Sequence, residues 1–359
     1  MTKKQIGRCC AFVLVVCLLL VFLSDLFELE NTTNYDKRFY TYRTLESNTV
    51  DAIVIGTSGI DRYYVAPKAF EEHGLSVYTL STDAMPSWLY IDVIEYACRK
   101  QDLKLVVVDM RAFRQNNTKS VTVDARGRRV IDAMDFFSLS RTKAAFKTME
   151  VMHAVSDENP RFDLSYLLPY IKFHSKWEEE YSIANNLGSK EHLYGGFFMS
   201  SRKSLKKQEQ SPLVYDNDVY EDLDPIAEES LYELLDYAEK KGLELLFVDT
   251  PHYKDDSEMA RSNTLQKILK ERGMNYVNYC QTNENGDFLY DLNLDHNNDF
   301  YNDAHVNYYG AEKFTDVFAR YLVENYDLPD RRQDEAAQKY WNGIYAKIKR
   351  DIEKWEKDA

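Results

Sequence analysis

The stretch "DAIVIGTSGIDRYY", Asp51 to Tyr64, carries the strongest fold signal in this chain. It begins with β-branched and apolar residues and reaches Gly56, a pattern typical of a buried strand that ends in a turn. Similar short apolar runs recur along the chain, at residues 76–81, 103–110, 243–251 and 274–280. The run "LKLVVVDM" at 103–110 is continuously apolar, as in strands buried on both faces of a parallel sheet.

Segments with apolar residues at helical spacing lie between these runs, at residues 87–101, 226–242 and 262–273. Strands that alternate with helices and short loops are typical of an open, doubly wound α/β sheet. The sequence therefore predicts a doubly wound parallel sheet of about five strands. The segment from about residue 114 to residue 222 is too long for a single crossover between two strands. It includes a helical pattern at 139–155. We interpret it as a partly helical insertion that caps one side of the sheet.

The amino-terminal segment predicts a membrane anchor. Lys3, Lys4 and Arg8 precede an uninterrupted apolar run at 9–23, and residues 6–27 reach the length of about 20 that a spanning helix needs. No small-x-small cleavage site follows, so an uncleaved anchor is favoured over a signal peptide. The basic residues predict a cytoplasmic amino terminus and an exported remainder, which makes a single-pass cell-membrane protein. The predicted organisation is an anchor at 1–27, a polar stalk at 28–48 and one domain at 49–359.

Charge and cysteine content narrow the function classes. The 359-residue chain has 45 Lys and Arg against 59 Asp and Glu, a net charge of −14. An acidic chain argues against nucleic acid as a partner and against electrostatic docking to anionic lipid. Three of the five cysteines fall in the predicted anchor, which leaves Cys98 and Cys280. Two distant cysteines form neither a disulfide framework nor a zinc motif, so no metal and no cofactor is expected.

Two polar residues fall where an α/β sheet places its chemistry. Such sheets bind ligands beyond the carboxyl ends of their strands. Ser58 follows the first predicted strand by a short turn, near a helix start whose N–H groups would hold an oxyanion. His305 follows the fifth predicted strand and precedes a final amphipathic helix. The two residues are therefore predicted to meet as a nucleophile and its general base.

The stretches "IVIGTSGI" (53–60) and "YNDAHVNYYGAEKFT" (301–315) resemble the SGNH/GDSL hydrolase superfamily. They look most similar to membrane-anchored, extracytoplasmic proteins that accompany membrane-bound O-acyltransferases in bacterial polymer acylation. The D-alanyl-lipoteichoic acid biosynthesis protein and the alginate O-acetyltransferases belong to that group. The resemblance covers residues 50–110 and 240–325, and it implies a flavodoxin-like fold. It also implies an esterase or O-acyltransferase that acts on a polysaccharide or teichoic-acid-like polymer, with a membrane-bound O-acyltransferase as partner.

Carried over residue by residue, the resemblance makes Ser58 the nucleophile, His305 the general base and an aspartate before it the orienting acid. The superfamily commonly has this aspartate three residues before the histidine, where this chain has Asn302. Asp303, two residues before, is therefore predicted to take the role, with a helix cap or loop residue as the alternative. The family's glycine and asparagine of the oxyanion hole are not evident. These departures leave a second hypothesis, an inactive SGNH-like scaffold that binds polymer or an acyltransferase partner.

Three further residues are candidates for substrate binding. Arg62 closely follows Ser58, His252 ends the fourth predicted strand, and Asn307 follows His305. Arg62 has an alternative role as the ion-pair partner of Asp61, and His252 an alternative structural role. The loop at 291–302 places four Asp and Asn residues at calcium-loop spacing, but its sixth and twelfth positions are not the required Gly and Glu. A polar loop is the favoured interpretation of this segment.

Overall fold

A computed structural model of the chain describes residues 1–26, 35–175, 194–201, 218–252, 254–281, 289–295 and 297–358. Its centre is a five-stranded, wholly parallel sheet in the order β2-β1-β3-β4-β5. The strands are β1 (Ala52–Ile55), β2 (Val77–Thr79), β3 (Leu105–Asp109), β4 (Glu244–Asp249) and β5 (Asn275–Asn278). Each strand lies within one of the five apolar runs, so the predicted sheet is confirmed.

The strand order sets the place of the site. β1 lies between β2 and β3, and the register pairs Ile53 with Tyr78 on one side and with Val106 on the other. All residues of β1 and β3 are buried, as the continuously apolar runs predict. The direction of winding reverses between β1 and β3, and loops leaving their carboxyl ends diverge there to form a crevice. Ser58 and Asp109 stand at that point.

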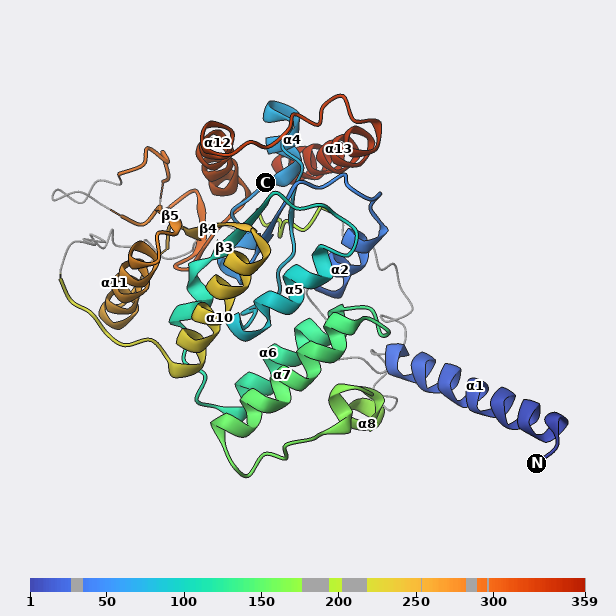
Figure 1. The fold of residues 1–359 in the computed structure, drawn as a ribbon. Coiled ribbons are helices and arrows are strands. Elements are labelled where there is room, and N and C mark those ends of the chain that lie inside the picture. The colour runs from blue at the N-terminus through green and yellow to red at the C-terminus, as the bar shows by residue number, and fades with distance from the viewer. Residues whose placement is uncertain are drawn as a thin grey trace.

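Helices cover both faces of the sheet (Figure 1). One face carries α4 (Ala66–His73), α12 (Tyr308–Asn325) and α13 (Glu335–Asp358), and the other carries α5 (Tyr90–Ala97), α10 (Pro225–Lys241) and α11 (Asp256–Glu271). Helix α13 was not anticipated from the sequence. It packs on α4, with the Trp341 ring stacked 6.3 Å from that of Phe70, which is why Trp341 is almost completely buried.

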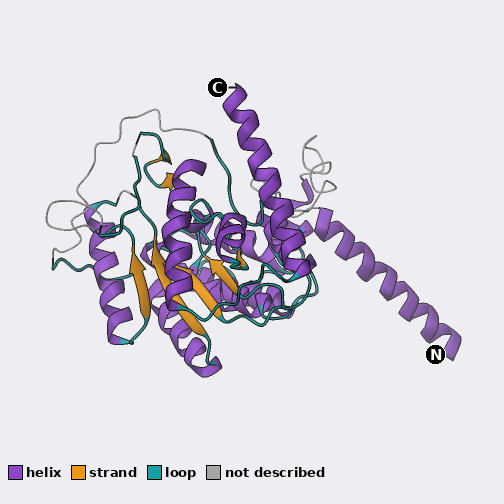
Figure 2. Ribbon diagram, turned by 90° about the horizontal axis from the view of Figure 1, so that it is seen from above, coloured by secondary structure: helices purple, strands orange, loops and turns teal. Residues whose placement is uncertain are grey.

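The amino-terminal region contains one helix that is apolar and long enough to cross a membrane. This helix, α1 (Lys3–Leu26), projects from the domain (Figures 1 and 2), and an 18-residue window within residues 3–23 has a mean hydropathy of 2.8. The predicted stalk is wrong for residues 35–44, which form helix α2 (Tyr35–Thr44). Phe39 of α2 is buried in the core, and Arg38 pairs with Asp61 at 2.8 Å between Nη1 and Oδ2. Residues 28–34 of the predicted stalk lie outside the described residues.

The insertion after β3 is partly helical, as predicted. It contains α6 (Ser120–Ala133), α7 (Leu139–Val155), the 3₁₀ turn η3 (Leu164–Tyr166) and α8 (Tyr170–Phe173). Helix α6 packs on α2 and α7 packs on α5, so these two helices form an outer layer over other helices and not directly over the sheet (Figure 1). Residues 194–201 cross back to the carboxyl edge of the sheet, where the Phe198 N–H donates to the Asp61 carbonyl at 2.7 Å. Residues 176–193 and 202–217 of the insertion fall outside the described residues.

Candidate active site

The turn that carries Ser58 is shaped by close contacts. A Cβ on Gly56, whose φ is +156°, would lie 2.2 Å from the Cβ of Asp109, so only glycine fits there. Thr57 caps the single helical turn α3 (Ser58–Asp61), because its Oγ1 accepts the Gly59 N–H at 3.0 Å. The sequence Gly-Thr-Ser-Gly thus turns the chain sharply out of β1 and leaves Ser58 at the start of α3.

Asp109, at the end of β3, holds this turn in place. Its Oδ2 accepts from the backbone N–H of Thr57 at 2.9 Å and from the Thr57 hydroxyl at 2.6 Å. Its Oδ1 accepts from the Arg111 N–H at 3.0 Å, within the 3₁₀ helix η2 (Met110–Arg114). Charge-assisted bonds of this kind are among the stronger hydrogen bonds in proteins. The position of Ser58 is therefore set by the neighbouring strand.

Gly59→Ala is expected to destabilise the protein by about 1–3 kcal/mol, the usual cost of overpacking. The new Cβ would lie 2.7 Å from the Arg111 Nε and 3.0 Å from the Asp109 Oδ2. Chemical denaturation measures the change. Gly343→Ala in α13 is the matched control, because nothing lies within 4 Å of its new Cβ. An equal effect of both substitutions would contradict the close packing around Gly59.

His305 reaches the site on a short hairpin. Strands β6 (Phe300–Asn302) and β7 (His305–Val306) pair antiparallel, with Asn302 opposite His305. The His305 Nε2 lies 2.8 Å from the Ser58 Oγ, and its Nδ1 lies 2.9 Å from the Asn302 Oδ1. The structure therefore brings together the predicted serine and histidine across a separation of 247 residues.

The hydrogen bonds around Asn302 define the tautomer of His305. The atom that faces Nδ1 also accepts the Ala304 N–H at 2.9 Å, so it must be the amide oxygen. Nδ1 then carries the proton and donates it to Asn302, while Nε2 is unprotonated and accepts from the Ser58 hydroxyl. This is the tautomer that a general base for Ser58 needs.

Asp303 was predicted to orient the imidazole, but the contact to the His305 Nδ1 comes from Asn302. Asp303 lies in the turn between β6 and β7 and is exposed, whereas Asn302 is the cross-strand partner of His305. Cross-strand neighbours in a hairpin face one another, and the residue after them points elsewhere. The position three residues before the histidine is therefore the one that meets it, and in this chain that position holds an amide.

Ala304, the residue before His305, is held through both of its backbone polar groups. The Asn302 Oδ1 accepts the Ala304 N–H. The Ala304 carbonyl accepts the Tyr63 hydroxyl and the Arg111 Nη2, each at 3.2 Å. The guanidinium of Arg111 also lies against Gly59, the residue after Ser58. Arg111 thus connects the serine turn to the histidine hairpin. No pattern in the sequence indicates this role.

No protein-family model and no curated protein sequence matches this chain.

The electrostatic surroundings keep His305 neutral. Burial lowers its pKa to about 2, and the positive charges of Arg111 and Arg62 add to the effect. Among the described residues, no carboxylate oxygen lies within ion-pair distance of the Arg111 guanidinium. A neutral imidazole can accept the serine proton, but neither the amide of Asn302 nor the two arginines favour the imidazolium that forms.

The buried histidines predict a loss of stability on acidification. His252 resembles His305, because burial and the neighbouring positive charges lower its pKa well below 6.5. Between pH 6.5 and 5 both stay neutral in the folded state and gain a proton on unfolding. The contribution of these histidines to the free energy of unfolding is thus fully present above pH 6.5. It falls below that pH, by about 1.4 kcal/mol per pH unit for each histidine.

Denaturation curves measured at several pH values check this slope. His305→Gln is expected to remove about half of the histidine contribution. His174→Gln is the control, because His174 is exposed and should leave the slope unchanged. Burial also raises the pKa of Asp92 to about 7, which shifts the total slope in the opposite direction, so the comparison of variants is decisive. A slope that is the same in His305→Gln as in the wild type would contradict the neutral state of His305.

The three predicted substrate-binding residues have different positions. Arg62 is close to the site, with its guanidinium 3.9 Å from the ring centre of Phe198 and 5.4 Å from that of Tyr301. Asn307 is buried and caps α12, because its Oδ1 accepts the Gly310 N–H at 3.2 Å. Phe198 comes from the insertion, and aromatic content was the only sequence signal for it.

His252 lies in a buried ionic cluster below the sheet edge. Asp249 binds Arg114 at 2.6 Å and Lys254 at 3.0 Å, and the Lys254 Nζ lies 2.8 Å from the Cys280 Sγ. Only 4% of His252 is exposed, so its predicted substrate contact is replaced by a structural role. Ligand-type atoms of Asp249, His252 and Cys280 lie within 4.8 Å of one another. Two cations already neutralise Asp249, which makes this a poor metal site.

The loop considered for calcium is organised by a lysine. The Lys313 Nζ donates to the Asn293 carbonyl at 2.9 Å and to the Asp299 Oδ2 at 2.7 Å. An ammonium group therefore takes the oxygens that a cation would use, as suits a polar loop. Residue 296 of this loop is outside the described part of the chain.

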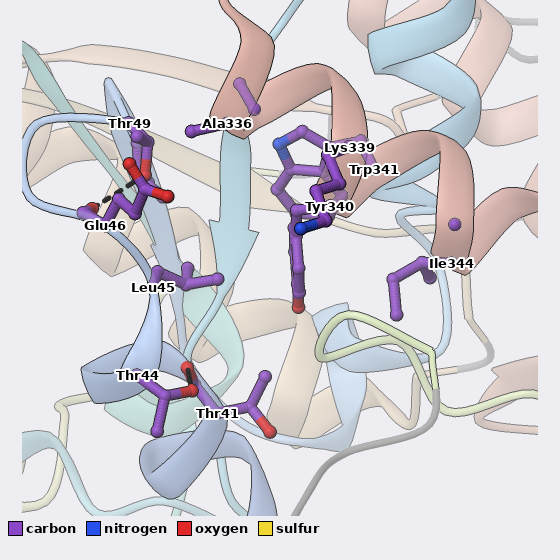
Figure 3. Close-up of a pocket in the computed structure, with 13 residues that line it drawn as sticks. Thr41, Thr44, Leu45, Glu46, Thr49, Ala336, Lys339, Tyr340, Trp341 and Ile344 are labelled. Carbon is purple, nitrogen blue, oxygen red and sulfur yellow. Dashed lines mark hydrogen bonds between the residues drawn. The ribbon is translucent and has the colours of Figure 1, made fainter.

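A cavity of about 400 Å³ lies at the other end of the sheet, between α2 and α13 (Figure 3). Thr41 and Leu45 line it from α2 and the residues that follow, and Trp341 and Ile344 line it from α13. Val50, which precedes β1, also borders it, whereas Ser58 follows β1. The cavity is thus distinct from the serine and histidine.

Proposed function

We propose that this protein is an exported, membrane-anchored, SGNH-like acyl-ester enzyme, an esterase or an O-acyltransferase. The observation that carries the proposal is the 2.8 Å contact between the Ser58 Oγ and the His305 Nε2, with Asn302 fixing the productive tautomer. A nucleophile, a base within hydrogen-bond reach and an orienting group are the three parts that acyl transfer requires.

The reaction proceeds in two halves. The Ser58 Oγ attacks the ester carbonyl while His305 takes the hydroxyl proton. His305 then returns that proton to the ester oxygen as its bond to the acyl carbon breaks, and the alcohol leaves. The resulting acyl-enzyme is attacked by water in an esterase or by a polymer hydroxyl in an O-acyltransferase, with His305 again as base. The Arg111 guanidinium, which lies beside the Ser58–Gly59 peptide, supplies positive charge for the tetrahedral oxyanion.

The membrane assignment rests on α1 and on the charges around it. The apolar segment can span a bilayer, and the basic residues before it favour a cytoplasmic amino terminus. A tethered domain suits a surface polymer better than a diffusible lipid. The polymer and a membrane-bound O-acyltransferase partner are proposed from the sequence resemblance.

A serine-reactive fluorophosphonate probe tests the proposal directly. The full-length protein in detergent is expected to be labelled at Ser58 and to cleave an activated acetyl ester. Ser58→Ala should abolish both, whereas Ser47→Ala, at an exposed position, should change neither. Labelling or turnover that survives in Ser58→Ala would place the chemistry elsewhere.

A non-catalytic scaffold is the second candidate, and one observation favours it. His305 faces a neutral amide and two arginines, so its protonated form is poorly stabilised. A wild-type protein that is folded but neither labels nor cleaves esters, alone or with a co-expressed acyltransferase, would favour the scaffold.

A further inference from the structure

Exposed apolar side chains are concentrated on the insertion. Beyond residue 26, twelve large apolar side chains among the described residues are exposed, and seven of these lie between residues 121 and 171. Six of the seven form what we call the insertion surface, namely Phe137, Leu139, Phe146, Phe162, Leu164 and Ile171. Apolar patches on soluble domains usually mark interaction sites.

Two of these side chains are in contact, and two share a helix face. The rings of Phe146 and Phe162 lie 6.3 Å apart, although they come from α7 and from the loop after it. Leu139 and Phe146 are two helical turns apart on α7, so they share one face. Phe137 is 80% exposed, an unusual state for a phenylalanine that has no partner surface.

The first part of the insertion, residues 114–174, has a small excess of basic residues. Residues 114–174 contain ten Lys and Arg against seven Asp and Glu, whereas the whole chain has a net charge of −14. Lys143, Arg161 and Lys172 are exposed there, with Lys143 paired to Glu95 at 2.6 Å and Lys172 paired to Asp124. The net charge of the whole chain argues against anionic lipid as a partner, but residues 114–174 have more basic than acidic residues. Basic residues around exposed aromatic ones are typical of protein surfaces that bind membranes.

The position of α8 indicates which membrane. This short helix carries Ile171 and lies against α1 (Figure 1). The insertion surface therefore includes the part of the domain nearest to the segment that can span a bilayer. We propose that the insertion surface docks on the bilayer that holds α1, with its phenylalanines among the lipid headgroups and its basic residues on anionic phosphates. The domain is then held to the membrane at two places.

Photocrosslinking from the full-length protein in its native membrane tests this inference. Benzoylphenylalanine replaces Phe146 or Phe162, which it closely resembles, and the lipids carry labelled phosphate. Irradiation is expected to give lipid adducts at both positions. Leu289 and Val323, which are comparably exposed but lie outside the insertion, are the control positions and should give little adduct.

Each outcome decides the question. Lipid adducts that fall about tenfold when Phe137, Leu139 and Leu164 are changed together to aspartate would support docking, since each removes interfacial apolar area. Adducts with a protein would overturn the inference and identify a polypeptide partner for this surface. Equal lipid labelling at the control positions, or none at Phe146 and Phe162, would also overturn it.

Discussion

Alanine at position 305 is expected to lower ester turnover by about 10²- to 10⁴-fold, the usual contribution of general acid–base catalysis. The reason is geometric: the His305 Nε2 is the acceptor 2.8 Å from the Ser58 hydroxyl. The loss should appear in kcat as well as in kcat/KM, because the proton moves in the transition state. Steady-state hydrolysis of an activated acetyl ester measures it.

Two controls separate catalysis from folding in this experiment. His174→Ala, at an exposed histidine, should keep wild-type turnover. Added imidazole should restore part of the activity of His305→Ala, because a small base can enter the space left by the ring. Unchanged turnover in a folded His305→Ala protein would remove the histidine from the mechanism.

Asn302→Asp is expected to raise turnover by about ten- to a hundredfold. A carboxylate in place of the amide oxygen, 2.9 Å from the His305 Nδ1, would stabilise the imidazolium that forms during the reaction. An opposite charge at this distance shifts a pKa by about 1 to 3, and each step of one corresponds to about tenfold. The acid limb of the pH–rate profile should also move to higher pH, because the carboxylate raises the pKa of His305.

Asp303→Asn is the matched partner of this substitution. It removes a carboxylate one residue away, from an exposed turn position, and should change turnover less than about twofold because surface charges interact weakly. A large loss in Asp303→Asn, with no gain in Asn302→Asp, would show that the hairpin register differs during catalysis.

The sheet could be predicted from the sequence because its strands are buried on both faces. Runs such as residues 103–110 are short, continuously apolar and rich in valine, which is typical of strands in parallel sheets. Helix α13 was missed because it follows the last strand, so the alternation of strands and helices gives no reason to expect it. Helix α2 at residues 35–44 was not predicted because its composition is mostly polar. Arg38 of this helix is buried because Asp61, elsewhere in the chain, neutralises its charge.

The serine and the histidine of the candidate site could be predicted, but the residues that position them could not. Ser58 and His305 each follow a strand, and strand ends can be read from the sequence. The choice between Asn302 and Asp303 depends on the register of a two-residue hairpin, which the local pattern does not encode. The role of Arg111 could not be predicted, because its bond to the Ala304 carbonyl joins parts of the chain 193 residues apart.

The sequence separation within the site bears on how the protein is made. A chain that emerges from its amino end exposes Ser58 long before His305, because 247 residues separate the two. During that interval Ser58 has no base and is an ordinary, unreactive hydroxyl. Reactivity would arise only once nearly the whole domain has been synthesised and folded. Truncated products would therefore be chemically silent, and premature attack on esters during transit would be avoided.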